Sequence, residues 1–290
     1  MKPALSAIAL PETQHRSWWL WPNLLSLDAP VVALVWQEAF AAGLAVDLGW
    51  TQRALLAVCV WLAYCGDRLL DARRLPEGAV DSPRHAFARD HSTALTVAWC
   101  VGLALATVLA LQMSAREMLV GAGLLTVLGG YFLLHHVRAS RERAGRWKEL
   151  MAGVCFAAGT LFFVVLNLQI AVPVVWGSFV LAALAWGGLC VINCLVIAGW
   201  DRESDAAMKQ PSLARRWAGM ERALPMMALG LVGMILGATV LDDRWVPLAL
   251  ALAASALALL ELARRPNGGS AEARRVWADA VLLTPLLVLV

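Results

Sequence analysis

The sequence has few features from which a disulfide-bonded or zinc-binding protein could be built. Its six cysteines all lie in apolar runs, and none forms a Cys-x-x-Cys pair or another spacing typical of zinc ligands. A buried cysteine behaves as a small apolar residue, so we expect neither a disulfide nor a structural metal. The short apolar segment 4–10 meets Pro11 and Glu12 without a typical cleavage site, so we also expect no cleavable signal peptide.

Charge is scarce as well. Only 16% of the 290 residues are charged, 60% are hydrophobic, and the mean hydropathy is +0.67. A soluble domain is closer to half apolar. The apolar residues form continuous runs of about twenty, the length that crosses a hydrocarbon layer of about 30 Å. They do not alternate with polar residues, which excludes a transmembrane β-barrel. The sequence therefore predicts an all-α, polytopic membrane protein, because helices satisfy their own backbone hydrogen bonds in lipid.

We expect nine transmembrane helices, preceded by a tryptophan-rich arm over residues 1–26 that lies at the membrane interface. Residues 27–290 then form a single transmembrane domain. Spans one to four and five to eight each place an acidic pair at the end of their second helix, followed by a basic loop. This internal repeat indicates a duplicated four-plus-four arrangement of helices with one additional helix. The nine spans are expected near 27–47, 51–71, 92–112, 116–136, 149–169, 173–199, 223–241, 245–263 and 276–290.

The basic residues indicate the orientation of these spans. The N-terminal arm and the loops that follow spans two, four, six and eight contain 21 of the 24 lysines and arginines. Loops rich in lysine and arginine stay on the cytoplasmic side of a membrane. We therefore expect an inner (cytoplasmic) membrane protein whose N-terminus is cytoplasmic and whose C-terminus lies on the opposite side.

Two acidic pairs stand at the cytoplasmic ends of the second and sixth spans. Asp67 and Asp71 are four residues apart, which on a helix separates their Cβ atoms by about 5–6 Å. Asp201 and Asp205 repeat this spacing, with Glu203 between them. Two carboxylates so close repel each other unless a cation or a strong donor lies between them, and hard oxygen ligands suit Mg²⁺. The repeated pairs favour a site for Mg²⁺ and a phosphate-bearing substrate, although solvated helix ends are the simpler alternative.

Basic residues in the same layer could bind the phosphate oxygens directly. Arg68 and Arg202 each follow the first aspartate of a pair, and the loops add Arg138, Lys148 and Lys209. Membrane topology and lipid headgroups explain any single one of them equally simply. Together with an apolar bundle, they suit a substrate that has a charged head and a hydrophobic tail.

The first acidic pair resembles a signature of the UbiA superfamily of intramembrane prenyltransferases. That signature reads Asn-Asp-x-x-Asp-x-x-x-Asp at the end of the second helix. Asp67 and Asp71 match its last two aspartates, whereas Ala63 and Tyr64 stand where the family usually has Asn-Asp.

Further positions strengthen the resemblance. The segment Asp201-Arg-Glu-Ser-Asp205 is similar to the family's second signature, Asp-x-Glu-Gly-Asp, with Ser204 in place of glycine. Tyr131 and His135 loosely match a Tyr-x-x-x-Lys element late in the fourth helix. Lys148 and Glu149 stand where the family begins its fifth span.

The resemblance implies a nine-helix bundle with a lipid-open cavity in which two aspartate-rich motifs hold Mg²⁺ and an isoprenoid diphosphate. Asp67 and Asp71 would hold one ion, and Asp201 and Asp205 another. The implied reaction transfers a prenyl group from a polyprenyl diphosphate to a lipophilic acceptor, either aromatic or lipid. The diphosphate would be bound by basic residues, aromatic rings would stabilise the allylic cation, and Asn193 would support the site from two turns before Asp201. The implied basic residues are Arg68, Arg138, Lys148, Arg202 and Lys209, and the implied rings are Trp61, Tyr64, Tyr131 and Trp186.

Other functions stay open at this point. A prenyl-diphosphate cyclase of the same superfamily would use the same residues. A transporter or a non-catalytic lipid-binding protein would keep the scaffold, and Glu38, expected near mid-depth of the first span, is the residue that fits a transporter. A phosphatidyltransferase fits less well, because Asp71-Ala-Arg73 lacks the glycine and further aspartate of that class. We expect membrane lipids but no nucleic acid as partners, and the oligomeric state stays open.

Overall fold

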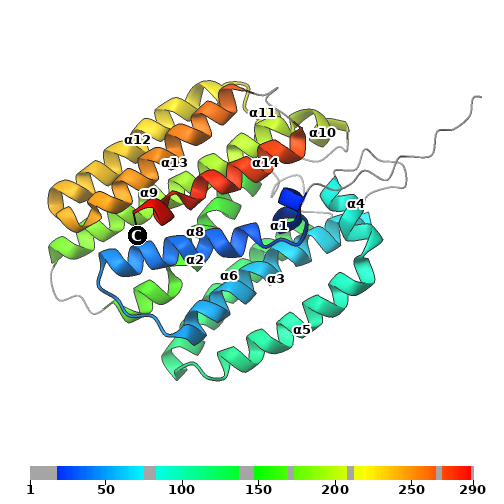
Figure 1. The fold of residues 1–290 in the computed structure, drawn as a ribbon, viewed down its shortest axis with the longest axis horizontal. Helices are drawn as coiled ribbons and strands as arrows, with labels where there is room; N and C mark the ends of the chain where they lie inside the picture. The colour runs from blue at the N-terminus through cyan, green and yellow to red at the C-terminus, as the bar shows by residue number, and fades with distance from the viewer. Residues whose placement is uncertain are drawn as a thin grey trace, which may run out of the picture.

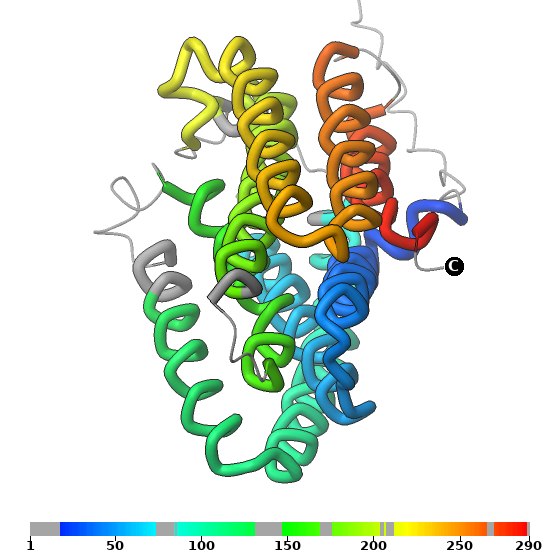
Figure 2. The backbone as a smooth tube through the Cα atoms, turned by 90° about the vertical axis from the view of Figure 1, so that its left-hand side faces the viewer, coloured from blue at the N-terminus to red at the C-terminus, as the bar shows by residue number. Residues whose placement is uncertain are grey.

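The computed structural model describes residues 18–74, 83–136, 147–168, 173–207, 212–265 and 270–288. All regular elements within these ranges are helices, as the sequence predicts (Figure 1). Viewed from the left-hand end of Figure 1, the molecule has α12 and α13 on one side and the α5–α6 pair on the other (Figure 2). Helices α2, α8 and α9 lie between them.

The first half of the chain contains four long helices and one short helix between the second and third. A 3₁₀ turn and a single helical turn precede them, and this segment bends by 78° into the first long helix. The elements are η1 (Trp18–Leu20), α1 (Trp21–Leu24), α2 (Asp28–Gly43), α3 (Trp50–Arg74), α4 (Pro83–Asp90), α5 (Ser92–Ala110) and α6 (Ala115–His136).

The second half repeats this order, with two short helices in the equivalent place. The elements are α8 (Lys148–Asn167), α9 (Pro173–Trp200), α10 (Arg202–Ala207), α11 (Leu213–Arg216), α12 (Met220–Leu241), η2 (Asp243–Trp245), α13 (Val246–Arg264), α14 (Ala271–Ala280) and η3 (Val281–Leu287).

Several of these helices are long and apolar enough to cross a membrane. By length and composition five qualify, in α5, α8, α9, α12 and α13, and a sixth qualifies if the bent segment before α2 and α2 itself form one span. The eight long helices overlap the first eight predicted spans. The region 276–290, predicted as a ninth span, is not one continuous α-helix over its described residues, because α14 ends at Ala280 and η3 follows. Pro285 lies within η3, where it lacks an N–H donor and disfavours the α conformation of the preceding residue.

Aromatic rings fix the centre of the bundle. The rings of Trp36 on α2 and Trp186 on α9 stack with centroids 4.1 Å apart. The indole Nε1 of Trp36 donates a hydrogen bond of 2.7 Å to the carbonyl of Leu282 in η3. Both tryptophans are fully buried. Their stacking and the indole hydrogen bond connect α2, α9 and the C-terminal segment.

Glycine allows α8 and α9 to approach each other closely. A Cβ atom on Gly153 of α8 would lie 2.7 Å from the backbone nitrogen of Val191 on α9 and 2.8 Å from its Cα. No larger residue fits between these backbones without moving one of the helices.

The short helices α4, α10 and α11 gather at one end of the bundle, at the right-hand side of Figure 1. The connections between α2 and α3 and between α12 and α13 lie at the opposite end. The first acidic pair ends α3 and the second follows α9, so both belong to the end that carries the short helices.

Candidate binding site at the α4 end of the bundle

Five charged side chains meet at this end of the bundle. Asp67 and Arg68 come from α3, Arg84 from α4, Asp201 from the position directly after α9, and Arg275 from α14. Arg84 is the common neighbour, because the other four all act on its guanidinium electrostatically. The two carboxylates that begin the predicted acidic pairs therefore face the same arginine, although they belong to different halves of the chain.

Asp201 is engaged in an ion pair. Arg275 donates a hydrogen bond from Nη2 to Asp201 Oδ1, and the two side chains are only 10% and 16% exposed respectively. The backbone nitrogen of Asp201 donates to the carbonyl of Ile197 at 3.0 Å, so Asp201 continues the last turn of α9. The ion pair holds α14 against the end of α9.

Arg84 lies in an unfavourable environment for a cation. Its side chain keeps some accessible surface but is closely surrounded by protein atoms. Desolvation, followed by the positive charges of Arg275 and Arg68, lowers the pKa of Arg84 to about 10, while Asp201 and Asp67 act in the opposite direction. Arg84 is therefore still charged at neutral pH, but its charge is incompletely compensated.

Arg68 is fixed by the backbone of the N-terminal segment. It is 9% exposed and donates a hydrogen bond from Nη1 to the carbonyl of Asn23. Asn23 in turn donates from Nδ2 to Asp28 Oδ2 at 2.6 Å. These contacts connect the end of α3 to the bent segment before α2.

Several buried arginine donors have no hydrogen-bond partner among the residues that the structure describes. They are Nε of Arg84, Arg274 and Arg275, and both Nε and Nη2 of Arg202. Arg202 reaches a carboxylate only loosely, with its Nη1 3.6 Å from Glu221 Oε1. Buried donors of this kind are costly unless a ligand or water accepts from them.

The other predicted site residues divide into two groups. Asp71 lies on α3 one turn beyond Asp67, Lys148 is the first residue of α8, and Asn193 donates from Nδ2 to Asp279 Oδ1 at 3.4 Å. For the remaining four, either the residue or its side chain lies outside the described part of the structure. These are Tyr131, Arg138, Asp205 and Lys209.

Two residues of the cluster were not among the predicted site residues. In the sequence, Arg84 lies in a basic loop and Arg275 in a turn-rich linker, and neither belongs to a motif. The short helix α4 begins with Pro83, a residue favoured in the first turn of helices, and this local signal could have indicated that Arg84 is held in place. No comparable signal in the sequence marks Arg275.

The donor set is compatible with Mg²⁺. This ion is usually held by one or two carboxylates together with the phosphate oxygens of its substrate, rather than by a complete protein cage. Asp67 and Asp201 supply two carboxylates beside guanidinium donors. Within the described ranges, no group of three or more His, Cys, Asp or Glu residues forms a self-sufficient metal site. The arrangement fits a metal that arrives with an anionic ligand.

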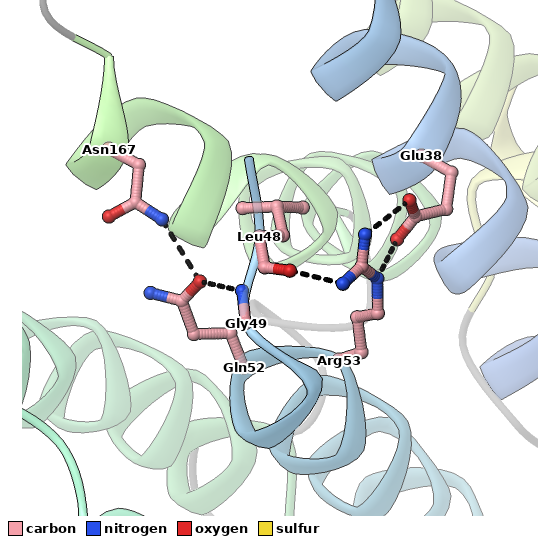
Figure 3. Close-up of polar contacts among 6 residues, drawn as sticks. All are labelled: Glu38, Leu48, Gly49, Gln52, Arg53 and Asn167. Atoms are coloured by element: carbon pink, nitrogen blue, oxygen red, sulfur yellow. Dashed lines mark hydrogen bonds and ion pairs between the residues drawn. The ribbon is translucent and has the colours of Figure 1, made fainter. Parts of the chain in front are cut away.

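A separate polar network occupies the opposite end of the bundle (Figure 3). Arg53 binds both carboxylate oxygens of Glu38, with distances of 2.6 and 2.9 Å, and also donates to the carbonyl of Leu48. Gln52 accepts hydrogen bonds of 3.0 Å from Gly49 N and from Asn167 Nδ2. Glu38 is therefore neutralised by an arginine at the start of α3.

This network borders an open cavity. The cavity has a volume of about 860 Å³ and is lined by Asp47, Gln52, Glu117 and Asn167, among others. The cavity is lined by none of the residues of the cluster around Arg84, so the cluster and this cavity are separate sites.

Comparison of the chain with protein-family models, with curated proteins and with solved structures gave no match. The resemblance to the UbiA superfamily therefore rests on the motif residues alone.

Proposed function

We propose that this protein is an intramembrane enzyme that binds a polyprenyl diphosphate at the cluster around Arg84 and, with Mg²⁺, transfers the prenyl group to a lipophilic acceptor. The observation that carries the proposal is that the charges of Arg68, Arg275, Asp67 and Asp201 all act on Arg84 at this end of the bundle.

The charge of this cluster supports an anionic ligand. One of the two carboxylates that act on Arg84 is already paired with Arg275. Among the described residues, the buried Nε donors of Arg84 and Arg275 have no hydrogen-bond partner, and they favour a group with several anionic oxygens. A diphosphate supplies such oxygens, whereas a single carboxylate ligand would satisfy only part of the set.

The surroundings of the cluster support a lipid-soluble substrate. Many side chains of α5 and α6 are apolar and exposed, as expected for helices that contact lipid. A molecule whose tail enters the bilayer could place its charged head at the end of the bundle. We further propose that the α4 end of the bundle is cytoplasmic.

The proposed reaction breaks the allylic C–O bond, so that diphosphate leaves with the bonding electrons. Arg68, Arg84 and Arg275 would stabilise the charge that develops on the departing oxygens. Bound Mg²⁺, held through Asp67 and Asp201, would contribute further charge neutralisation. The acceptor carbon then forms a bond to the prenyl carbon and loses a proton.

The test is to incubate the purified full-length protein with MgCl₂, radiolabelled prenyl diphosphates of several chain lengths and a membrane lipid extract. We expect release of diphosphate and a labelled lipophilic product, and both are lost in Asp67→Ala and Asp201→Ala. Asp243→Ala, an exposed aspartate at the opposite end, is the matched control and keeps activity. Binding without turnover would instead indicate a protein that retains the scaffold without the reaction.

A cyclase would give a different product from the same site. Diphosphate release without any requirement for the lipid extract would favour that reaction. A transport function draws no support from Glu38, because its carboxylate is bound by Arg53.

A further inference from the structure

A pair of carboxyl groups lies beneath the arginine cluster and belongs to neither acidic motif. Asp28 begins α2 and Asp279 lies near the end of α14, and their side chains are within hydrogen-bonding reach of each other. Asp28 accepts from Asn23 Nδ2 at 2.6 Å and from the backbone nitrogen of Ala29 at 3.0 Å. Asp279 accepts from Asn193 Nδ2 at 3.4 Å.

A small cavity adjoins Asp279 and the neighbouring Asn193. Its volume is about 20 Å³, and its polar walls come from Tyr64, Asn193 and Asp279. A space of this size holds one water molecule or one small ion, but no organic ligand. The rest of the lining is apolar or thiol-bearing, so a charged occupant would have to be bound by these few polar groups.

Asn193 supplies an independent indication of a ligand. The residue is 8% exposed, and its Oδ1 is buried with no hydrogen-bond partner in the described part of the chain. An amide oxygen can only accept a hydrogen bond or coordinate a cation. A hydrogen-bond donor or a cation in the cavity lined by Asn193 and Asp279 would satisfy Asn193 Oδ1.

Asp28 and Asp279 are half-buried, and two carboxylates this close together repel each other unless a cation or a proton lies between them. Arg68 acts on Asp279, but its Nη1 is already donated to Asn23. A proton shared between the two carboxyl groups would relieve their repulsion but would leave Asn193 Oδ1 unsatisfied. A cation can bind oxygens of all three side chains at once.

We propose that Asp28, Asp279 and Asn193 form a buried site for one small divalent cation of the Mg²⁺ or Mn²⁺ class. The ligands are hard oxygens, as these ions prefer, and two carboxylates balance their charge. The site joins α2, α9 and α14. It is separate from Asp67 and Asp201, and it does not depend on the proposed prenyl transfer.

The test uses Mn²⁺ alone as the probe, with purified full-length protein that has been stripped of metal by a chelator. Binding is followed by the loss of the electron paramagnetic resonance signal of free Mn²⁺, without any prenyl diphosphate. We expect Asp279→Asn and Asn193→Leu to weaken binding at least about tenfold. Asn193→Asp keeps an oxygen ligand and should retain binding, which separates loss of a ligand from loss of the fold.

Two further variants assign the ion to its site. Asp243→Asn, at the opposite end, should bind Mn²⁺ as the wild type does. Asp67→Ala should also retain this ion even if it abolishes prenyl transfer, so the two proposals can fail separately. Unchanged binding in Asp279→Asn, loss of the ion in Asp67→Ala alone, or a wild type that binds no Mn²⁺ would each overturn the site and leave a shared proton as the explanation.

Discussion

Arg275 on α14 donates a hydrogen bond to Asp201 at the end of α9, 74 positions earlier in the chain. Both side chains are nearly buried, so this pair is part of the packing of the bundle as well as of the charged cluster. A ligand that binds Arg84 must therefore share Arg275 with Asp201 or displace it. The proposed ligand therefore lies next to the contact between α14 and the end of α9.

The first prediction concerns the stability of this pair. Arg275→Met should lower the free energy of unfolding by about 3 kcal/mol, because it leaves the Asp201 carboxylate largely buried without its partner. Combining it with Asp201→Asn should cost less than the sum of the two single changes, since the buried charge is then removed. The measurement is equilibrium unfolding of the detergent-solubilised protein.

The control for the Arg275 and Asp201 variants is Arg265→Met. Arg265 pairs with Glu261 at 2.5 Å, but its side chain is 73% exposed. Exposed pairs contribute between about 0 and 1 kcal/mol, so this change should be small. Equal losses at Arg275 and Arg265 would show that burial of the Asp201 pair has no energetic consequence.

The second prediction concerns pH. Burial and the neighbouring arginines lower the pKa of Arg84 to about 10. Binding of inorganic diphosphate, measured by calorimetry, should therefore fall as the pH rises through about 10, where Arg84 loses its proton.

Arg84 has the opposite effect on the pH dependence of stability, since it should make the free energy of unfolding rise with pH while diphosphate binding falls. Its pKa is lower in the folded than in the unfolded protein, so between the two values the unfolded chain binds more protons. The contribution of Arg84 to the free energy of unfolding therefore rises with pH above about 10. Arg84→Ala should weaken diphosphate binding about tenfold at neutral pH and remove both effects. The exposed Arg116, at the other end of the bundle, is the control for loss of one positive charge.

The third prediction concerns the indole hydrogen bond in the core. Trp36→Phe should preserve most of the stacking on Trp186 but leave the carbonyl of Leu282 without its donor. We expect a loss of about 1–3 kcal/mol in the free energy of unfolding. Trp18→Phe, at a side chain that is 83% exposed, should change it by less than about 0.5 kcal/mol. A similar loss in both variants would contradict a specific role for the bond.

The long helices could be predicted from the sequence because their apolar runs have the length of a membrane crossing, which is a local property. The shared end of Asp67 and Asp201 also follows from the sequence, since an even number of predicted spans separates them. Arg84 and Arg275 could not be found in this way. Their positions depend on how α4 packs against α3 and on how α14 returns to α9, and neither is encoded by the composition of the segments themselves.

The ninth span shows the limit of reasoning from apolar length. Residues 276–290 are apolar enough to suggest a continuous helix, but Pro285 and the change to 3₁₀ geometry divide the segment.

Glu38 shows a second case that apolar length could not predict. Its partner Arg53 lies 15 residues later, across the connection between α2 and α3, so the ion pair depends on how that connection folds.

The last prediction tests the close approach of α8 and α9 with two glycines of the same helix. Gly153→Ala should lower the free energy of unfolding by about 1–3 kcal/mol, because the added Cβ would lie 2.7 Å from Val191 N, and backbone cannot yield as a side chain can. Gly159→Ala adds the same methyl group where no atom lies within 4 Å, so it should be neutral or stabilise the helix by up to about 1 kcal/mol. Unfolding of both variants under identical conditions separates packing from helix propensity.

Because Asp201 directly follows α9, a shift of α9 that relieves the Gly153 contact should also change diphosphate binding at Arg84, whereas Gly159→Ala should leave it unchanged. Equal stability of the two variants would contradict the close contact between α8 and α9.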